Sequence, residues 1–256
     1  MSQFLLCELG VSAVKQEVEK MAHSFEPVRA EEARIRAAYA RREETDSRYS
    51  WFSSGYQFRM QQRERKVLTL LRRQDCKDLG SKKILEVGCG AGEWLLDLVK
   101  WGARPENITG IDLLEDRVSK ARRLCAPGVH IECASAADLP FYNGTFDMVL
   151  QATVFTSILD PDLKRRVADE MMRVVKPDGF ILWYDYHVNN PWNPDVRGVN
   201  QGEIKRLFPN CRIELKRSTL LPQLALLLAP YSYLACYLLE KFPLLCTHYL
   251  GVIRKG

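Results

Sequence analysis

The most informative stretch of the chain is ILEVGCGAGEW, residues 84–94. The apolar run 84–87 predicts a buried strand, and the glycines at positions 88, 90 and 92 predict a tight turn that leads into a helix. Glycines at such a turn let a ligand approach bare backbone beside a helix N-terminus. This stretch therefore predicts a nucleotide-like ligand at the end of a strand.

The spacing of these glycines narrows the choice of ligand. A dinucleotide-binding turn has the pattern Gly-x-Gly-x-x-Gly, but counting from Gly88 the third position falls on Glu93. No Lys-Ser or Lys-Thr pair follows the turn, so a phosphate-binding P-loop is not indicated. Asp112 ends the next predicted strand, about 20 residues further on, where its carboxylate can accept hydrogen bonds from both hydroxyls of a ribose.

Strand and helix patterns alternate from Lys83 to the end of the chain. This alternation predicts an α/β fold: a Rossmann-like, doubly wound, mostly parallel seven-stranded sheet with helices on both faces. The strands are expected at 83–88, 107–112, 129–133, 146–151, 180–186, 212–217 and 249–254. The helices between them are expected at 92–101, 115–124, 162–175 and 203–208.

Two flanking regions complete the predicted organisation. Residues 1–80 are expected to form a helical N-terminal arm or cap, broken at Pro27 and ending in a helix at 58–73, and residues 81–256 the ligand-binding domain. Near the C-terminus, the run from Ser218 to Leu239 contains no charged residue but is interrupted by prolines. We expect an apolar helical insert at about 219–246, before the last strand, that caps the pocket, forms a dimer face or lies on a membrane.

Composition excludes several classes of function. The 37 basic and 32 acidic residues give a formal net charge of +5 and are interleaved, which disfavours a nucleic-acid partner. The eight cysteines include no Cys-x-x-Cys pair, so neither a disulfide framework nor a metal site is expected. The first residues lack the pattern of a signal peptide. The chain is therefore expected to be cytoplasmic, with peripheral attachment to a membrane as the alternative, and a monomer or a homodimer.

Five motifs in order make the sequence resemble the class I methyltransferases that depend on S-adenosylmethionine (SAM). They are 86–92 (EVGCGAG), 110–112 (GID), 138–141 (DLPF), 146–149 (FDMV) and 174–179 (VVKPDG). The resemblance implies SAM as the cofactor, S-adenosylhomocysteine as the product and methylation as the activity.

The resemblance also implies roles for individual residues. Glu86 would reach toward the methionine amino group, residues 88–92 would line the methionine and ribose, Asp112 would hold the ribose hydroxyls, and Leu113 would pack on the adenine. The N-terminal arm would add further walls. The expected cofactor-binding residues are Glu86, Gly88, Cys89, Gly90, Gly92, Asp112, Leu113, Ser135, Ala136, Gln151, Val154, Tyr39 and Arg41.

One position departs from the family pattern. Four residues before the Leu-Pro-Phe element, relatives usually have an Asp that accepts a hydrogen bond from the adenine amino group, whereas this chain has Ser135. A hydroxyl can still accept a hydrogen bond, and the backbone of Ala136 can still face the adenine. Weakened or water-mediated adenine recognition is therefore expected.

The chemistry of methyl transfer suggests where to look for the acceptor site. Because the leaving group is excellent, the enzyme mainly aligns the acceptor and excludes water, and only a poor nucleophile needs a base. His187 and Asp185, at the end of the predicted strand 180–186, are the candidate catalytic residues. The alternative for His187 is a surface histidine that is hydrogen-bonded to its neighbours. The candidate substrate residues are Phe155, Tyr184, Trp192, Arg197 and Tyr56, with a structural pairing to Asp195 as the alternative role of Arg197.

The sequence thus predicts a SAM-dependent methyltransferase for a small-molecule, sugar or lipid-linked acceptor. O-methylation is favoured because His187 and Asp185 offer a base. The alternative is a SAM-fold protein that binds without turnover and docks through the insert at 219–246. A nicotinamide dehydrogenase is disfavoured by the glycine spacing.

Overall fold

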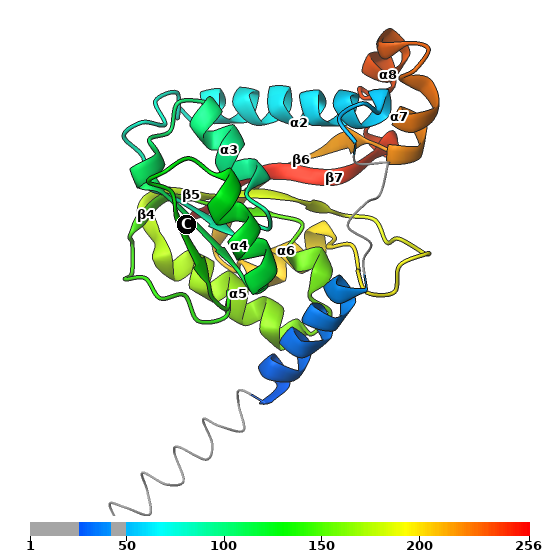
Figure 1. Cartoon of the computed structure of the whole chain (residues 1–256). Helices are drawn as coiled ribbons and strands as arrows, with labels where there is room; N and C mark the ends of the chain where they lie inside the picture. The colour runs from blue at the N-terminus through cyan, green and yellow to red at the C-terminus, as the bar shows by residue number, and fades with distance from the viewer. Residues whose placement is uncertain (1–25, 42–49) are drawn as a thin grey trace, which may run out of the picture.

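The computed structural model describes residues 26–41 and 50–256, so predictions for 1–25 and 42–49 lie outside the described residues. One seven-stranded sheet runs through the molecule in the order β3-β2-β1-β4-β5-β7-β6 (Figure 1). The strands are β1 (Ile84–Val87), β2 (Ile108–Asp112), β3 (His130–Cys133), β4 (Phe146–Ala152), β5 (Val175–Tyr186), β6 (Cys211–Leu220) and β7 (Cys246–Lys255). β7 pairs antiparallel with β5 and with β6, and the other neighbouring strands of the sheet pair parallel. The predicted α/β fold with a mostly parallel seven-stranded sheet is confirmed.

Helices cover both faces of the sheet because each carries an apolar stripe. On one face, α2 (Ser54–Arg73), α3 (Glu93–Lys100) and α4 (Glu115–Leu124) pack their buried side chains against the sheet. On the other face lie α5 (Pro161–Val174), α6 (Gln201–Leu207) and the helix 26–40, drawn in blue in Figure 1. Short 3-10 turns occur at η2 (Pro105–Asn107), η3 (Phe155–Ser157) and η4 (Pro243–Leu245).

Parallel pairing gathers the site at one edge of the sheet. Val87 lies opposite Ile111 on one side and Gln151 on the other, and Asp112 lies opposite Cys133. Since these residues are at or near the carboxyl ends of their strands, the loops that follow β1, β2, β3 and β4 meet at the same edge. In open α/β sheets this edge is where ligands bind.

The predicted apolar insert is a pair of short helices, α7 (Pro222–Leu228) and α8 (Tyr233–Leu239), between β6 and β7. Figure 1 shows it beside the beginning of α2, outside the main layers. We call residues 221–245 the apolar lobe. Its exposed large apolar side chains are Leu227, Tyr231, Tyr233, Leu234, Tyr237, Leu238, Phe242 and Leu244. In the part of the chain that the structure describes, no helix is long and apolar enough to cross a membrane.

Among the element boundaries that differ from the sequence prediction are the starts of α2 and β5. The helix expected at 58–73 begins at Ser54, because the Ser53 side chain accepts a hydrogen bond from the amide of Tyr56 and caps it. The strand expected at 180–186 begins at Val175. An irregularity in the register with β4, between Phe146 and Met148, lets the Pro-Asp-Gly sequence at 177–179 lie within β5.

Candidate active site

The glycine turn after β1 is bound to the end of β2 by backbone hydrogen bonds. The amide of Cys89 donates to the carbonyl of Ile111 (2.8 Å), and the amide of Gly90 donates to Oδ2 of Asp112 (2.8 Å). Gly88 has a φ of 72°, and a Cβ there would lie 2.5 Å from a methyl carbon of Val154. Only glycine fits at this position, because the loop after β4 passes directly against the turn.

Asp112 is the carboxylate that joins the first two loops. Its Oδ1 accepts from the amide of Leu114 (2.9 Å), while its Oδ2 accepts from Gly90. Burial raises the pKa of Asp112, although both amides and the nearby Arg117 oppose the shift. Each carboxylate oxygen has a second lone pair, so both can accept another hydrogen bond.

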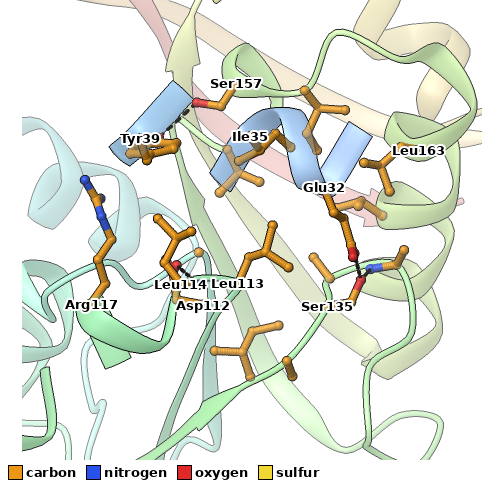
Figure 2. Close-up of a pocket in the computed structure, with 18 of the residues that line it drawn as sticks. Glu32, Ile35, Tyr39, Asp112, Leu113, Leu114, Arg117, Ser135, Ser157 and Leu163 are labelled. Carbon is orange, nitrogen blue, oxygen red and sulfur yellow. Dashed lines mark hydrogen bonds between the residues drawn. The ribbon is translucent and has the colours of Figure 1, made fainter. Parts of the chain in front are cut away.

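A cavity opens along this edge of the sheet (Figure 2). It runs from the glycine turn, past Asp112, to the loop after β3, and the helix 26–40 lies over it. Its lining includes six predicted residues of the domain, Gly88, Asp112, Leu113, Ser135, Ala136 and Val154, and Tyr39 of the arm. The remaining predicted cofactor residues are not part of the lining; they are Glu86, Cys89, Gly90, Gly92, Gln151 and Arg41.

Two of these, Glu86 and Gln151, place unpaired polar atoms behind the glycine turn. Both are buried, and neither Oε2 of Glu86 nor Nε2 of Gln151 has a hydrogen-bond partner among the described residues. Burial raises the pKa of Glu86 well above its ordinary value. A buried polar group without a partner is costly, so a bound group is expected to satisfy it. The α-ammonium and α-carboxylate of a methionine moiety offer the required donor and acceptor, and these residues therefore fit SAM.

Cys89 and Gly92, two further predicted residues of the glycine turn, pack within the domain and do not line the cavity. Cys89 is buried. Gly92 caps α3 with a φ of 90°, and a Cβ there would lie 2.5 Å from the sulfur of Cys125. Both positions therefore keep the turn close to α4 and the end of β2.

The loop after β4 is held in an unusual backbone conformation at the cavity. Thr153 has a φ of 60°, and its amide donates to the carbonyl of Tyr184 (2.8 Å). Strained residues of this kind persist where the surroundings hold them in place. Asp185 is one such support: it is fully buried and accepts hydrogen bonds from the hydroxyl and the amide of Thr156.

The N-terminal arm is fixed over the cavity by polar contacts with the domain. Glu31 accepts from the amides of Leu159 and Asp160, and Arg34 donates to the carbonyl of Ser157 (2.6 Å). Burial alone would raise the pKa of Glu31, but the hydrogen bonds from Arg34 and the two amides outweigh it and lower the pKa.

Tyr39 and Arg41, the predicted arm residues, have different surroundings. The Tyr39 hydroxyl lies 3.0 Å from Oγ of Ser157, and the guanidinium of Arg117 lies over its ring, 4.3 Å from the centroid. Arg41 is not part of the cavity lining. It forms an ion pair with Asp195 (3.0 Å) and so connects the arm to the loop after β5.

The predicted substrate residues are not brought together in this structure. Tyr184 is buried, with its hydroxyl 2.8 Å from Oγ1 of Thr219, and Phe155 is buried against Trp183. Tyr56 is buried at the start of α2, and its ring contacts Trp51 edge-on. Trp192 is 83% exposed. Arg197 pairs with Glu203 (3.4 Å) and not with Asp195, which was the alternative to a role in substrate binding.

His187 and Asp185, the predicted catalytic pair, face different surroundings. Nε2 of His187 lies 2.9 Å from the carbonyl oxygen of Cys246. A carbonyl oxygen only accepts, so Nε2 carries the proton and Nδ1 is left as the basic nitrogen. Burial lowers the pKa of His187. Its ring borders a second hollow, lined also by Lys164, Arg197 and Glu203, whereas Asp185 is enclosed beneath η3.

Several cavity residues were not predicted from the sequence. They are Glu32, Ile35, Ile111, Leu114, Arg117, Ala134, Ala137, Ala152, Thr153, Ser157, Ile158, Leu163 and Val167. Thr153 lies between Gln151 and Val154, two residues that the resemblance to the family implied. Glu32 lies on a helix whose apolar stripe was visible, but which domain residue it meets depends on how the arm docks.

Comparisons with known proteins support a methyltransferase domain. A family model described as a methyltransferase domain matches residues 84–179. A phthiotriol/phenolphthiotriol dimycocerosates methyltransferase of Mycobacterium tuberculosis is 35% identical over 142 residues, covering 53% of this chain and 50% of that protein. A fatty-acid O-methyltransferase of Mycolicibacterium smegmatis is 37% identical over 109 residues, covering 42% and 38%. The chain thus spans about half the length or less of these curated relatives.

A solved structure shares the fold at low identity. The (4+2)-cyclase SpnF has a TM-score of 0.57 and 20% identity, with coverage of 83% of this chain and 86% of that one. This likeness concerns the fold alone. Residues 84–179 match the model of a methyltransferase domain, and the ordered motifs and the strand order are those of a class I SAM-dependent methyltransferase domain.

Proposed function

We propose that the protein is a SAM-dependent methyltransferase for an acceptor with a long apolar chain, methylated on oxygen. The observation that carries the methyltransferase proposal is the pair of buried, unpaired polar atoms behind the glycine turn, Oε2 of Glu86 and Nε2 of Gln151. Their donor and acceptor character matches the two charged groups of a methionine moiety. An empty apolar pocket would not require such atoms.

The chain's own residues would divide the work of holding SAM, which supplies a methyl group activated by its sulfonium sulfur. Asp112 would accept the ribose hydroxyls, Glu86 and Gln151 would bind the methionine end, and Leu113 would pack on the base. The arm would close the cavity and exclude water. In this proposal residues 81–256 bind the cofactor. Of the predicted cap 1–80, the helix 26–40 lies over the cavity, whereas α2 packs on the other face of the sheet.

An acceptor with an apolar chain is supported by two observations. The apolar lobe exposes eight large apolar side chains, more than a monomeric soluble domain ordinarily gathers in one place. Two relatives are named for dimycocerosate and fatty-acid substrates. We propose that the lobe lies on a membrane or on a lipid. Arg65 and Lys66 beside the lobe and Lys241 within it surround a single carboxylate, Glu240, and the positive charge that remains favours an anionic surface.

The oxygen nucleophile decides whether a base is needed. A carboxylate is already ionised and needs only alignment. For a hydroxyl acceptor, Nδ1 of His187 is the proposed base, and its lowered pKa keeps the ring neutral near pH 7. Because His187 borders the second hollow and not the cavity, this role requires the acceptor hydroxyl to reach that hollow. Asp185 is proposed as a positioning residue that holds Thr156 and, through it, the loop after β4.

The test is methyl transfer from labelled SAM to a long-chain fatty acid, a long-chain alcohol and their short-chain counterparts. We expect labelled product only from the long chains. Mild alkali distinguishes the products, because a methyl ester is hydrolysed and a methyl ether survives. Binding of SAM without transfer to any long-chain oxygen acceptor would overturn the acceptor proposal. It would favour the alternative, a SAM-fold protein that binds without turnover.

A further inference from the structure

Ser135 stands where relatives carry the carboxylate that reads the adenine, and its hydroxyl is already engaged. Oγ of Ser135 donates to Oε1 of Glu32 (2.5 Å) and accepts from the amide of Ala137 (3.1 Å). A hydroxyl has one hydrogen and two lone pairs, so its donor is used and one acceptor position remains. The strong acceptor at this end of the cavity is therefore the carboxylate of Glu32.

Glu32 belongs to the arm and not to the methyltransferase domain. Figure 2 shows its side chain reaching from the helix 26–40 to Ser135, while Asp112 lies across the cavity. Among the described residues that line the cavity, Glu32 and Asp112 are the acids. The wall around them is mostly apolar, with Ile35 of the arm and Leu113 of the domain. Such a wall suits a flat aromatic base that carries one polar edge.

We propose that Glu32 accepts the hydrogen bond from the exocyclic amino group of adenine, so that the arm supplies the carboxylate that Ser135 has replaced. The inference rests on the proposed SAM site. Ser135 then acts as a positioning residue, because its donated hydrogen bond fixes one oxygen of Glu32 and leaves the other available. A hydrogen bond to an ionised acceptor is stronger than one to a hydroxyl.

The arm is anchored closely enough to hold a carboxylate in place. Glu31, the neighbour of Glu32, accepts from the amides of Leu159 and Asp160. Arg36, one turn further along, donates to the carbonyl of Leu113 (2.5 Å). These contacts fix the helix to the loops on two sides of the adenine end of the cavity. Adenine recognition and arm docking are thereby made one event.

The chemistry predicts selectivity for an amino group over an oxygen at the same position of the base. The probe pair is S-adenosylhomocysteine and S-inosylhomocysteine, in which the 6-amino group is replaced by a 6-oxo group. An oxo group facing a carboxylate brings two acceptors together and leaves both unsatisfied. We expect the wild-type protein to bind S-adenosylhomocysteine at least about tenfold more tightly in calorimetric titration.

Removing the carboxylate is the test of the assignment. In Glu32→Ala, the affinity for S-adenosylhomocysteine is expected to fall about tenfold while that for the inosine analogue changes little, so the selectivity disappears. Glu26→Ala removes an exposed carboxylate from the same helix and is expected to keep both affinities. The double variant Glu32→Ala/Ser135→Asp places the carboxylate on the domain and is expected to restore the selectivity.

The outcomes separate this inference from the proposed function. If the wild-type protein binds neither compound, the SAM site is wrong and the assignment of Glu32 is overturned with it. If it binds S-adenosylhomocysteine and Glu32→Ala keeps the same selectivity, only the assignment of Glu32 is overturned. Loss of both affinities in Glu32→Ala without recovery in the double variant means that Glu32 serves the arm's docking alone, which also overturns the inference.

Discussion

Asp185 shows how a side chain at the end of a strand can serve a neighbouring loop instead of the reaction. It is fully buried and binds the hydroxyl and the amide of Thr156, next to the strained Thr153. Burial raises its pKa to about 7, even though these hydrogen bonds and Lys164 oppose the shift. The folded protein therefore holds a proton on Asp185 at a pH where an unfolded chain has released it.

This difference predicts a pH dependence of stability. An ordinary Asp titrates near pH 3.9, so between about pH 4 and pH 7 the folded state binds more protons than the unfolded state. Stability contributed by Asp185 is then present at the acidic end and is lost as the pH rises through about 7. In Asp185→Asn this contribution is absent. We expect the Tm of the wild type minus that of the variant to fall by roughly 4 °C or more from pH 5 to pH 8.

The matched control is Asp116→Asn, which changes an exposed Asp in α4 and is expected to give the same difference at both pH values. The wild type and the variant share all other titrating groups, so the difference between their Tm values cancels the contribution of those groups. A difference for Asp185→Asn that stays constant between pH 5 and pH 8 would show that the carboxyl group is ionised in the folded protein.

For single residues, the sequence predicts positions that the local backbone fixes better than positions that depend on docking of the arm. Gly88, Gly90 and Asp112 were predictable because a strand, a tight turn and a second strand place them in one local unit. Glu32 was not, since its partner Ser135 is 103 residues away and meets it only through arm docking. The pairing of Arg197 with Asp195, the alternative to a role in substrate binding, does not form, and Asp195 pairs with Arg41 of the arm.

At the scale of elements, the apolar lobe depends on a close crossing of α2 and α7. A Cβ added to Gly55 would lie 2.6 Å from the Cα of Leu226, so backbone packs against backbone there. The sequence predicts that this helix begins only at residue 58. In the structure it is the first turn of α2, because Ser53 caps the helix and Gly55 admits α7.

This crossing predicts a large effect for a small substitution. Gly55→Ala is expected to lower the free energy of unfolding by about 1–3 kcal/mol, since neither backbone can yield without moving α7. Denaturant unfolding measures the change. Ser54→Ala, at the preceding position of the same helix, is the control and is expected to stay within about 0.5 kcal/mol of the wild type. Equal stability of both variants would contradict the close crossing.

The strands were predictable from alternation, whereas their ends were set by pairing. The expected edge strand 212–217 extends over Cys211–Leu220, and the last strand, expected at 249–254, over Cys246–Lys255. Both lengthen because β6 and β7 pair along almost their full length, up to Leu220 opposite Cys246. Local patterns do not report this partner, and so the prediction stopped where the apolar alternation stopped.

For the whole molecule, the apolar lobe predicts attachment to an anionic membrane surface. Leu234 is 67% exposed and Leu244 86% exposed. Each buried leucine contributes about 1.5–3 kcal/mol, so Leu234→Glu/Leu244→Glu is expected to weaken binding to vesicles of phosphatidylglycerol and phosphatidylcholine by at least about tenfold. Cosedimentation measures it. Pure phosphatidylcholine vesicles are expected to bind the wild type more weakly.

The control for this variant is Leu124→Glu, at the end of α4 away from the lobe and 53% exposed. It is expected to bind vesicles like the wild type. All three proteins are expected to bind S-adenosylhomocysteine equally, which verifies that they are folded. Undiminished vesicle binding by the double variant would exclude the lobe as the membrane contact.

The proposed binding of SAM at the carboxyl edge of the sheet depends on Asp112, which would hold the ribose. Calorimetric titration with SAM, S-adenosylhomocysteine and NAD tests it directly on the wild type, Asp112→Ala and the exposed-neighbour control Asp116→Ala. The wild type and Asp116→Ala are expected to bind SAM and S-adenosylhomocysteine but not NAD. The affinity of Asp112→Ala for both compounds is expected to be lower by at least about tenfold. Binding of NAD, or an Asp112→Ala variant that binds S-adenosylhomocysteine as tightly as the wild type, would contradict it.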